Sequence, residues 1–343
     1  MPARSTLRTV AKKAAAPAPS SLHRILGDFA SQRVLVVGDL VADHYVYGHT
    51  ERVSREAPVL VVRHERSEVK LGGAANAAAN LASLGARVRA VGLLGRDPMG
   101  ESLTQAFKAQ GIRLDAITSP KVVTETKTRI LAGGLSTTRQ QVVRLDQGAL
   151  EPPPPSLRER LARTVARVAA QVDAVLVSDY GAGVVGDEVR AVLRELVARG
   201  VTVCVDSRYG LMKFAGFPVL KPNEPELEAL VGRPLRTDRE VTEAGRQAKR
   251  MLRCNALVVT RGHKGMRVFT PRRVEDVPVH GAAEAVDVTG AGDTVIAALT
   301  LSLSAGASVV DAARVANVAG ALVVQKMGTA TLTLGELQEA LPR

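Results

Sequence analysis

The sequence predicts an α/β protein of the doubly wound type, a mainly parallel sheet with helices on both faces. Strand-like and helix-like segments alternate along most of the 343 residues and are joined by short links. The strand-like segments, such as 33–38 and 256–260, are continuous apolar runs, as expected for strands buried on both faces. Two regions, at about 44–66 and 122–146, alternate polar and apolar residues, which predicts a small β-sheet inserted beside the main one.

Length and composition limit the class of protein. With 46% hydrophobic residues, 343 residues suffice for one large domain or for a domain with an appendage. No window approaches the roughly 18 uninterrupted apolar residues of a membrane span, and no secretory signal is apparent, so we expect a cytoplasmic protein without a membrane partner. The cysteines, Cys204 and Cys254, lie in apolar segments without metal-ligand spacing, and we expect them to be buried hydrophobes.

The formal net charge of +12 raises the question of nucleic-acid binding. Residues 1–20 are rich in Ala and Pro, hold four basic side chains and no acidic one, and are predicted to be a disordered basic tail. Elsewhere the basic residues are mixed with acids, and only 3% of the chain is aromatic. We therefore expect no nucleic-acid partner. The remaining residues, 21–343, are expected to form one domain into which the small sheet is inserted.

The segment 285–299 carries the clearest chemistry. Gly290, Ala291 and Gly292 lack bulk, so their backbone N–H groups can turn toward one point before the apolar run continues as a helix. A helix N-terminus suits a phosphate or a developing phosphoryl charge. A carboxylate at Asp293 would repel a phosphate, so this position suits a general base that takes a proton from an attacking hydroxyl. Taken alone, the pattern fits a simple glycine turn before a helix equally well.

Polar side chains stand at the carboxyl ends of several predicted strands, namely Asp39, Asp179, Asp206 and Asn223. Because the carboxyl ends of parallel strands lie on one edge of the sheet, this edge is the predicted active site. Asp39 and Asp43 suit sugar hydroxyls, since each carboxylate can accept more than one hydrogen bond. A cap or turn role explains either residue alone equally well.

Two helix starts offer further candidate groups. Gly72 and Gly73 precede an Ala-rich helix, and Gly73 and Asn76 can hold a substrate oxygen at its first turn, although such helices are also common packing devices. Asn223 and Glu226 stand three residues apart and can hold the water shell of Mg²⁺, but the same spacing makes a capping box. The later apolar helix at 307–324 has room beside it for a flat ring.

These motifs, in this order, resemble the ribokinase (PfkB) family of carbohydrate kinases from about residue 30 to 341. Its two signatures are matched by Gly72-Gly73-Ala-Ala-Asn76 and Asp287-Val-Thr-Gly-Ala-Gly-Asp293. Segments 38–48, 52–59, 144–146 and 178–180 most resemble the kinase domain of the bifunctional heptose 7-phosphate kinase/heptose 1-phosphate adenylyltransferase proteins. The sequence contains no P-loop, no Gly-x-Gly-x-x-Gly after the first strand, and no His-x-Gly-His of an adenylyltransferase.

The resemblance implies a ribokinase-like fold whose small β-sheet is a lid, with ATP and Mg²⁺, and as an option a monovalent cation, as cofactors. It implies that Asp293 is the base and that Gly290, Ala291 and Gly292 form the anion hole. The implied sugar contacts are Asp39, Asp43, Gly72, Gly73, Asn76 and Asp179. The implied nucleotide contacts are Asn223, Glu226, Thr260, Arg261, Gly262, Gly265, Asp287 and Asn317, with Glu226 reaching the metal through water.

The reaction implied by the resemblance is phosphorylation of D-glycero-D-manno-heptose 7-phosphate at its anomeric hydroxyl, a step in lipopolysaccharide core synthesis. The partners are then a sugar phosphate and ATP, and we expect a homodimer through the lid. Gly181 and its neighbours replace a Lys of the heptose kinases after Ser-Asp-Tyr, and Arg208 lies in a second segment that differs. The alternatives are therefore a kinase for another sugar or sugar phosphate and a catalytically silent sugar-binding regulator.

A phosphorylated acceptor needs fixed cations at the lid or its edge. Lys127, Arg129 and Arg144 lie on predicted lid strands, and Arg208 lies beyond the carboxyl end of a main strand. We expect one or more of these side chains to bind the acceptor's own phosphate. A solvated charged face is the alternative for each of them.

Overall fold

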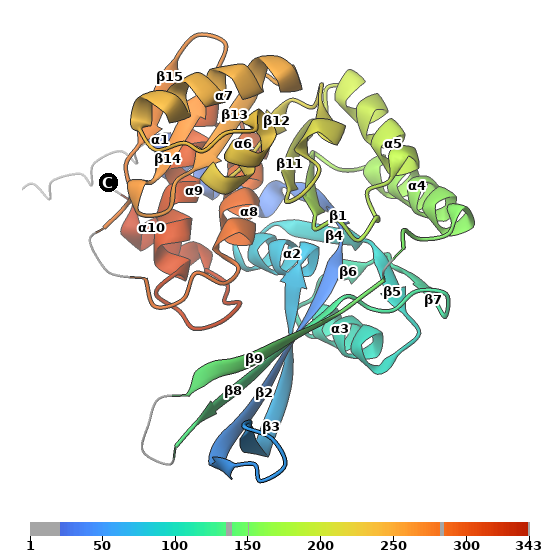
Figure 1. Ribbon diagram of the computed structural model, residues 1–343. Coiled ribbons are helices and arrows are strands. Elements are labelled where there is room, and N and C mark those ends of the chain that lie inside the picture. Colours follow the sequence, from blue (N-terminus) through green and yellow to red (C-terminus); the bar gives the residue numbers. More distant parts are fainter. Residues whose placement is uncertain (1–20, 135–138, 150, 282–284, 342–343) are drawn as a thin grey trace, which may run out of the picture.

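The computed structural model describes residues 21–341, apart from 135–138, 150 and 282–284. Two β-sheets dominate it, a large sheet between layers of helices and a smaller sheet that projects from the body (Figure 1). The expected basic tail, residues 1–20, lies outside the described residues. The described helices include none that is long and apolar enough to cross a bilayer.

The large sheet is mainly parallel. Its strands, in spatial order, are β15 (Val274–Val277), β14 (Met266–Phe269), β13 (Ala256–Thr260), β12 (Val219–Leu220), β11 (Thr202–Ser207), β10 (Ala174–Asp179), β1 (Arg33–Gly38), β4 (Arg87–Val91) and β6 (Arg113–Leu114). Among the described strands of this sheet, β14 alone runs opposite to the others, because it pairs antiparallel with both β13 and β15. A separate parallel pair is formed by β5 (Leu93–Gly95) and β7 (Ile117–Ser119). β4 pairs with β1 on one side and β10 pairs with it on the other, so the order of the strands reverses between β1 and β10. Ligands of such sheets bind at the carboxyl ends of the strands at this switch point.

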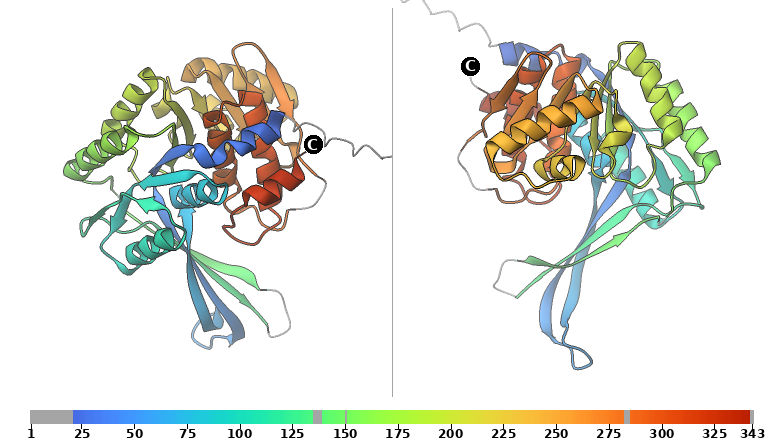
Figure 2. Two further views of the ribbon diagram at one scale, coloured as in Figure 1. Left: turned by 180° about the vertical axis from the view of Figure 1, so that it is seen from behind. Right: turned by 45° about the horizontal axis from the view of Figure 1, so that its top comes forward.

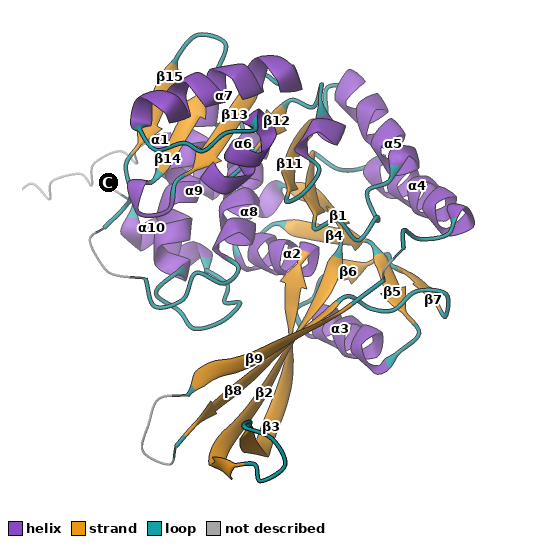
Figure 3. Cartoon of the chain, in the orientation of Figure 1, coloured by secondary structure: helices purple, strands orange, loops and turns teal. Residues whose placement is uncertain are grey.

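Helices cover both faces of the large sheet, as Figure 3 shows. One face carries α1 (Ser21–Gly27), α2 (Ala74–Ser83), α3 (Pro98–Ala109), α8 (Ala291–Ser304), α9 (Val309–Val323) and α10 (Leu334–Ala340). The other carries α4 (Pro155–Ala169), α5 (Asp187–Ala198), α6 (Glu224–Val231) and α7 (Asp238–Leu252). Successive residues of β1 alternate between the two cores, since Val34 and Val36 join the first and Leu35 and Val37 the second. This confirms the predicted fold class.

The small sheet contains β3 (Leu60–Gly73), β2 (Leu40–Val53), β8 (Thr126–Gly133) and β9 (Gln140–Gln147), in that order. It is mixed, because β2 pairs antiparallel with β3, β8 antiparallel with β9, and β2 parallel with β8. Figure 2 shows from two further sides that it projects away from the helices. β2 and β3 extend beyond the predicted region at about 44–66. β2 begins one residue after β1, and β3 continues directly into α2.

One glycine fixes how closely the strands approach at the switch point. A Cβ atom on Gly38 would lie 1.9 Å from the carbonyl oxygen of Ser178, its partner on β10. No side chain fits there without separating the two strands. Asp39, which follows Gly38, is therefore held directly beside the end of β10.

Candidate active site

Asp293 lies in the first turn of α8, at the edge of the sheet where polar side chains were predicted to gather. Gly290 caps this helix in the left-handed conformation, with φ of 78°, which a side chain would disfavour. The residue is only 3% exposed. A carboxylate is thus buried beside the positive end of a helix, which favours an anion. Of the three predicted anion-hole amides, that of Ala291 donates to the carbonyl of Val288 over 3.2 Å.

Both oxygens of the Asp293 carboxylate accept hydrogen bonds from other elements. Asn76 on α2 donates through Nδ2 to Oδ2 over 2.9 Å, and the hydroxyl of Tyr180, just after β10, donates to Oδ1 over 2.9 Å. The Asn76 amide is itself fixed, because Asn80 Nδ2 donates to its Oδ1 over 3.1 Å. Thr294 in turn donates to Asn80 over 2.9 Å. This buried chain sets the orientation of the carboxylate before any ligand is present.

Burial raises the pKa of Asp293 to about 7, and the charges of Asp206 and Asp43 act in the same direction. The hydrogen bonds from Asn76 and Tyr180 oppose this rise, since they stabilise the charged form. A carboxylate whose pKa lies near neutrality can both accept a proton and be ionised when needed. The geometry therefore fits the predicted base.

Asp39 faces the loop that follows β10. Its carboxylate accepts backbone N–H groups of Tyr180 (2.7 Å), Ala182 (3.2 Å) and Val184 (3.4 Å), and the residue is 1% exposed. Burial raises its pKa to about 7. Asp39 thus shapes the loop that carries Tyr180, a role that the interpretation as a sugar contact did not include. Asp179 is also engaged, since its carboxylate accepts Ser207 Oγ at 2.7 Å.

The four candidate cations at the lid differ in their surroundings. Arg129 forms an ion pair with Asp43 at 2.6 Å that packs against Gly72, where a Cβ would lie 2.5 Å from the Asp43 carboxylate. Arg144 pairs with exposed Asp146 on its own strand.

Lys127 is different, because its Nζ lies 4.5 Å from the ring centroid of Tyr180 and no ion pair holds it within the described residues. Burial lowers the pKa of Lys127; the charge of Asp43 opposes this, and those of Arg144 and Arg208 add to it. The guanidinium of Arg208 lies 5.7 Å from the ring centroid of Tyr209. Since neither side chain has an ion pair among the described residues, Lys127 and Arg208 are the candidates for an acceptor phosphate.

A cavity of about 600 Å³ opens beside the N-terminus of α8. Its walls are mostly apolar, and Ala291 and Gly292 of the first turn form part of them. Of the predicted nucleotide residues, Thr260, Gly262, Gly265 and Asn317 line this cavity. His263 also lines it and was not predicted. The Asn317 amide donates to the carbonyl of Pro278 over 2.7 Å, which anchors the cavity wall.

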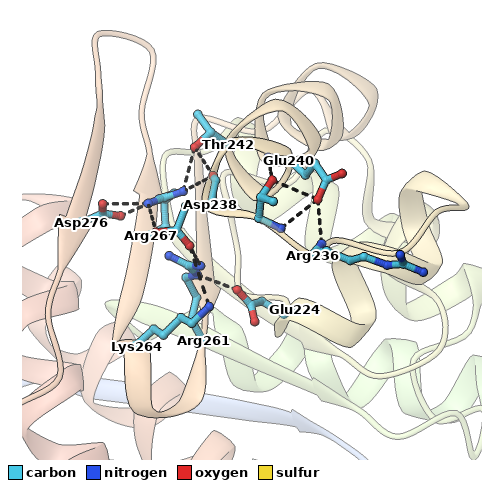
Figure 4. A network of polar contacts seen from close by, with 10 residues as sticks. Glu224, Arg236, Asp238, Glu240, Thr242, Arg261, Lys264, Arg267 and Asp276 are labelled. Atoms are coloured by element: carbon cyan, nitrogen blue, oxygen red, sulfur yellow. Dashed lines mark hydrogen bonds and ion pairs between the residues drawn. The ribbon is translucent and has the colours of Figure 1, made fainter.

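The other four predicted nucleotide residues do not line this cavity, and two of them, Arg261 and Asp287, have partners elsewhere. The guanidinium of Arg261 is buried in ion pairs with Glu224 of α6 and Asp238 of α7, both at 2.6 Å (Figure 4), and Arg261 does not line the cavity. Asp287 accepts the N–H groups of Thr289 (2.9 Å) and Gly328 (2.8 Å) and lines a separate cavity beneath the small sheet. The resemblance implied a nucleotide contact for both residues, but in the structure their side chains have these other partners.

Asn223 and Glu226 form the capping box at the start of α6. Asn223 Oδ1 accepts the Glu226 N–H over 2.7 Å, and Glu226 Oε2 accepts the Asn223 N–H over 2.9 Å. Burial and the charge of Asp206 raise the pKa of Glu226. The capping box, which was the alternative to a magnesium site, is therefore present. The carboxylate of Glu226 still lies close enough to that of Asp206 for their charges to interact.

Two further groups at this edge, Tyr180 and Lys221, were not predicted. Lys221 follows β12, and its Nζ lies 3.0 Å from Asp206 Oδ2 in the buried site. The sequence offered one weak signal, a lysine placed between a buried strand and Pro222. Tyr180 lies in segment 178–180, which resembles the heptose kinases, but that resemblance gave no role for its side chain.

The family model described as pfkB family carbohydrate kinase matches residues 31–334. A D-beta-D-heptose 7-phosphate kinase of Bordetella bronchiseptica is 39% identical, over 90% of this chain and 96% of its own length. The bifunctional protein HldE of Mesorhizobium japonicum is 39% identical over 95% of this chain, which spans 65% of that protein.

Solved structures share the fold at lower sequence identity. Phosphofructokinase-2 of Escherichia coli, in complex with potassium, superposes with a TM-score of 0.75 at 19% identity, over 90% of this chain and 97% of that one. Arabidopsis thaliana ribokinase, complexed with ribose and ATP, gives a TM-score of 0.70 at 23% identity, over 90% and 98% of the two chains.

The raised pKa of Asp293 can be measured directly. In infrared difference spectra of the wild type against Asp293→Asn, we expect the carboxylate band to appear with a midpoint near pH 7. Tyr180→Phe should move the midpoint upward, because it removes a donor that stabilises the ionised form. Tyr209→Phe, at a 76% exposed position, should leave it unchanged. A carboxyl already ionised at pH 5 would contradict the assignment.

Proposed function

The chain belongs to the pfkB family of carbohydrate kinases, and we propose that it transfers the γ-phosphoryl group of ATP to the anomeric hydroxyl of D-glycero-D-manno-heptose 7-phosphate. The product would be heptose 1,7-bisphosphate. One observation carries the proposal, namely the oriented carboxylate of Asp293 at the N-terminus of α8. The relatives named as heptose 7-phosphate kinases, at about 39% identity, support the choice of sugar.

The proposed reaction needs a base, an anion site and in-line geometry. The acceptor hydroxyl lies against Asp293, which takes its proton as the oxygen attacks the γ-phosphorus. A new O–P bond forms while the bond from the γ-phosphorus to the β,γ-bridging oxygen breaks, and ADP leaves with that electron pair. The amides of Gly290 and Gly292, at the N-terminus of α8, stabilise the charge that develops on the transferred group.

The apolar cavity of about 600 Å³ is the proposed nucleotide site. A mostly apolar cavity with a few polar groups suits a purine ring. Because Ala291 and Gly292 belong both to its wall and to the first turn of α8, a nucleotide there would direct its phosphates toward Asp293. This shared wall is what connects the two halves of the proposed site.

The residues at this edge also fit Mg²⁺. Asp206 and Glu226 are partly buried carboxylates with raised pKa values, and the charge of Asp206 adds to the rise at Glu226. A cation relieves such repulsion, and carboxylate oxygens and waters are the ligands that Mg²⁺ prefers. When bound, Mg²⁺ would neutralise phosphate charge. Asp206 and Glu226 are the residues proposed to hold it, directly or through water.

The small sheet is the proposed lid and homodimer contact. All residues of β9 are exposed, including Val143 (52%) and Leu145 (62%), so the sheet presents apolar side chains beyond the body of the protein. A second copy that covered them would remove this apolar surface from water. Sedimentation velocity measures the dimer directly, and a monomer at working concentrations would refute this part of the proposal.

A substrate screen tests the function. ADP release should be fastest with heptose 7-phosphate when it is compared with fructose 1-phosphate, fructose 6-phosphate, ribose and nucleosides. Phosphorus NMR of the product should show a new phosphate on the anomeric carbon. Turnover of another sugar would keep the kinase but reject heptose as the acceptor. Turnover of none would favour the sugar-binding regulator.

The acceptor's own phosphate should depend on Lys127 and Arg208. Replacing either by Ala should raise the KM for heptose 7-phosphate by about 10-fold or more, since a hydrogen bond to a charged group contributes roughly 1.5–3 kcal/mol. The KM for ATP should change little. The control is Arg52→Ala, which removes an exposed cation from the small sheet that also carries Lys127. An unchanged sugar KM in both variants would mean that these cations do not bind the acceptor's phosphate.

A further inference from the structure

Lys221 is a buried lysine that the proposed reaction has not yet used. Lys221 directly follows β12 and is 3% exposed, and its Nζ lies 3.0 Å from Asp206 Oδ2. An ammonium group has three N–H donors. Within the part of the chain that the structure describes, Asp206 is its one hydrogen-bonding partner. A buried cation with spare donors is costly unless something else accepts from them.

The charges around Lys221 keep it protonated. Burial favours the neutral amine, but Asp206, Glu226 and Asp293 all favour the ammonium, and together they raise its pKa. One cation therefore lies among three carboxylates, including the proposed base. If Lys221 served only as the partner of Asp206, it would not need to lie near Glu226 and Asp293 as well.

The position of Lys221 relative to α8 is defined by Gly292. A Cβ placed on Gly292 would be 4.0 Å from Nζ of Lys221 and 4.0 Å from Oδ2 of Asp206, which are its nearest atoms outside the helix backbone and the two adjoining residues. The absence of a side chain thus leaves open space between the ammonium and the first turn of the helix. This is the same turn whose amides are the proposed anion hole.

We propose that Lys221 is a catalytic residue whose Nζ contacts the transferring phosphoryl group across the open space beside Gly292. The inference rests on the proposed function, because it assumes phosphoryl transfer at α8. Lys221 keeps its proton throughout, so the bonds formed and broken are those of the transfer to the acceptor hydroxyl. Its spare N–H donors stabilise the phosphoryl oxygens, which the neighbouring carboxylates would otherwise repel.

The test must separate this role from that of a partner for Asp206. Lys221→Met leaves Asp206 buried without its cation, so a loss of stability is expected and by itself decides nothing. The double variant Lys221→Met/Asp206→Asn removes both charges and should recover the Tm of Asp206→Asn. Its kcat should nevertheless stay about 10²–10³-fold below that of Asp206→Asn, the scale for losing one oxyanion donor. Equal kcat values in the two variants would overturn the proposal.

A binding measurement supplies a readout without turnover. By calorimetry, the double variant should bind a non-hydrolysable ATP analogue about 10-fold or more weakly than Asp206→Asn, because a charge-assisted contact is lost. Both variants should bind AMP equally, since AMP carries no γ-phosphate. The exposed Lys108→Met should match the wild type in every assay. Unchanged analogue binding would also overturn the proposal, and this result does not depend on which sugar is the acceptor.

Discussion

A buried carboxylate is the constraint on which the site depends. Removing an ionised group from water is expensive unless hydrogen bonds replace the solvent. Asp293 obtains them from Asn76 on α2 and Tyr180 after β10, so three segments far apart in sequence must meet at one point. The switch point of the sheet allows this meeting, because β1 and β10 approach closely at Gly38 and the loops beyond them face α8. The site is therefore built by the topology of the sheet as much as by its own residues.

The small sheet is coupled to this site by covalent continuity and by contact. β3 ends where α2, the helix that carries Asn76, begins. β2 begins one residue after β1, and that residue, Asp39, accepts the backbone N–H of Tyr180. On β8, Lys127 lies over the ring of Tyr180. A movement of the sheet on binding the acceptor would thus reach the tyrosine that orients the base. Exclusion of water and orientation of the carboxylate can then occur together.

Sequence reasoning recovered the parts of the structure that depend on local pattern. Continuous apolar runs identified the buried strands, and the glycines before Asp293 identified the helix start, because both signals are short-range. It failed where the direction of a side chain is set by distant partners. Arg261 stands at a strand end as predicted, yet Glu224 and Asp238 draw it away from the cavity. Tyr180 and Lys221 gain their importance from Asp293 and Asp206, which contact them only in the folded chain.

The central claim is that Asp293 is the base of a phosphoryl transfer, and the kinetics of Asp293→Asn test it most directly. Asparagine keeps the shape of the side chain but cannot accept the proton. With the best substrate of the screen, kcat should fall by about 10²–10⁴-fold, the usual contribution of a general base. Calorimetric binding of the ATP analogue should be nearly unchanged, and the exposed Asp28→Asn should behave as the wild type. Full turnover in Asp293→Asn would contradict the account.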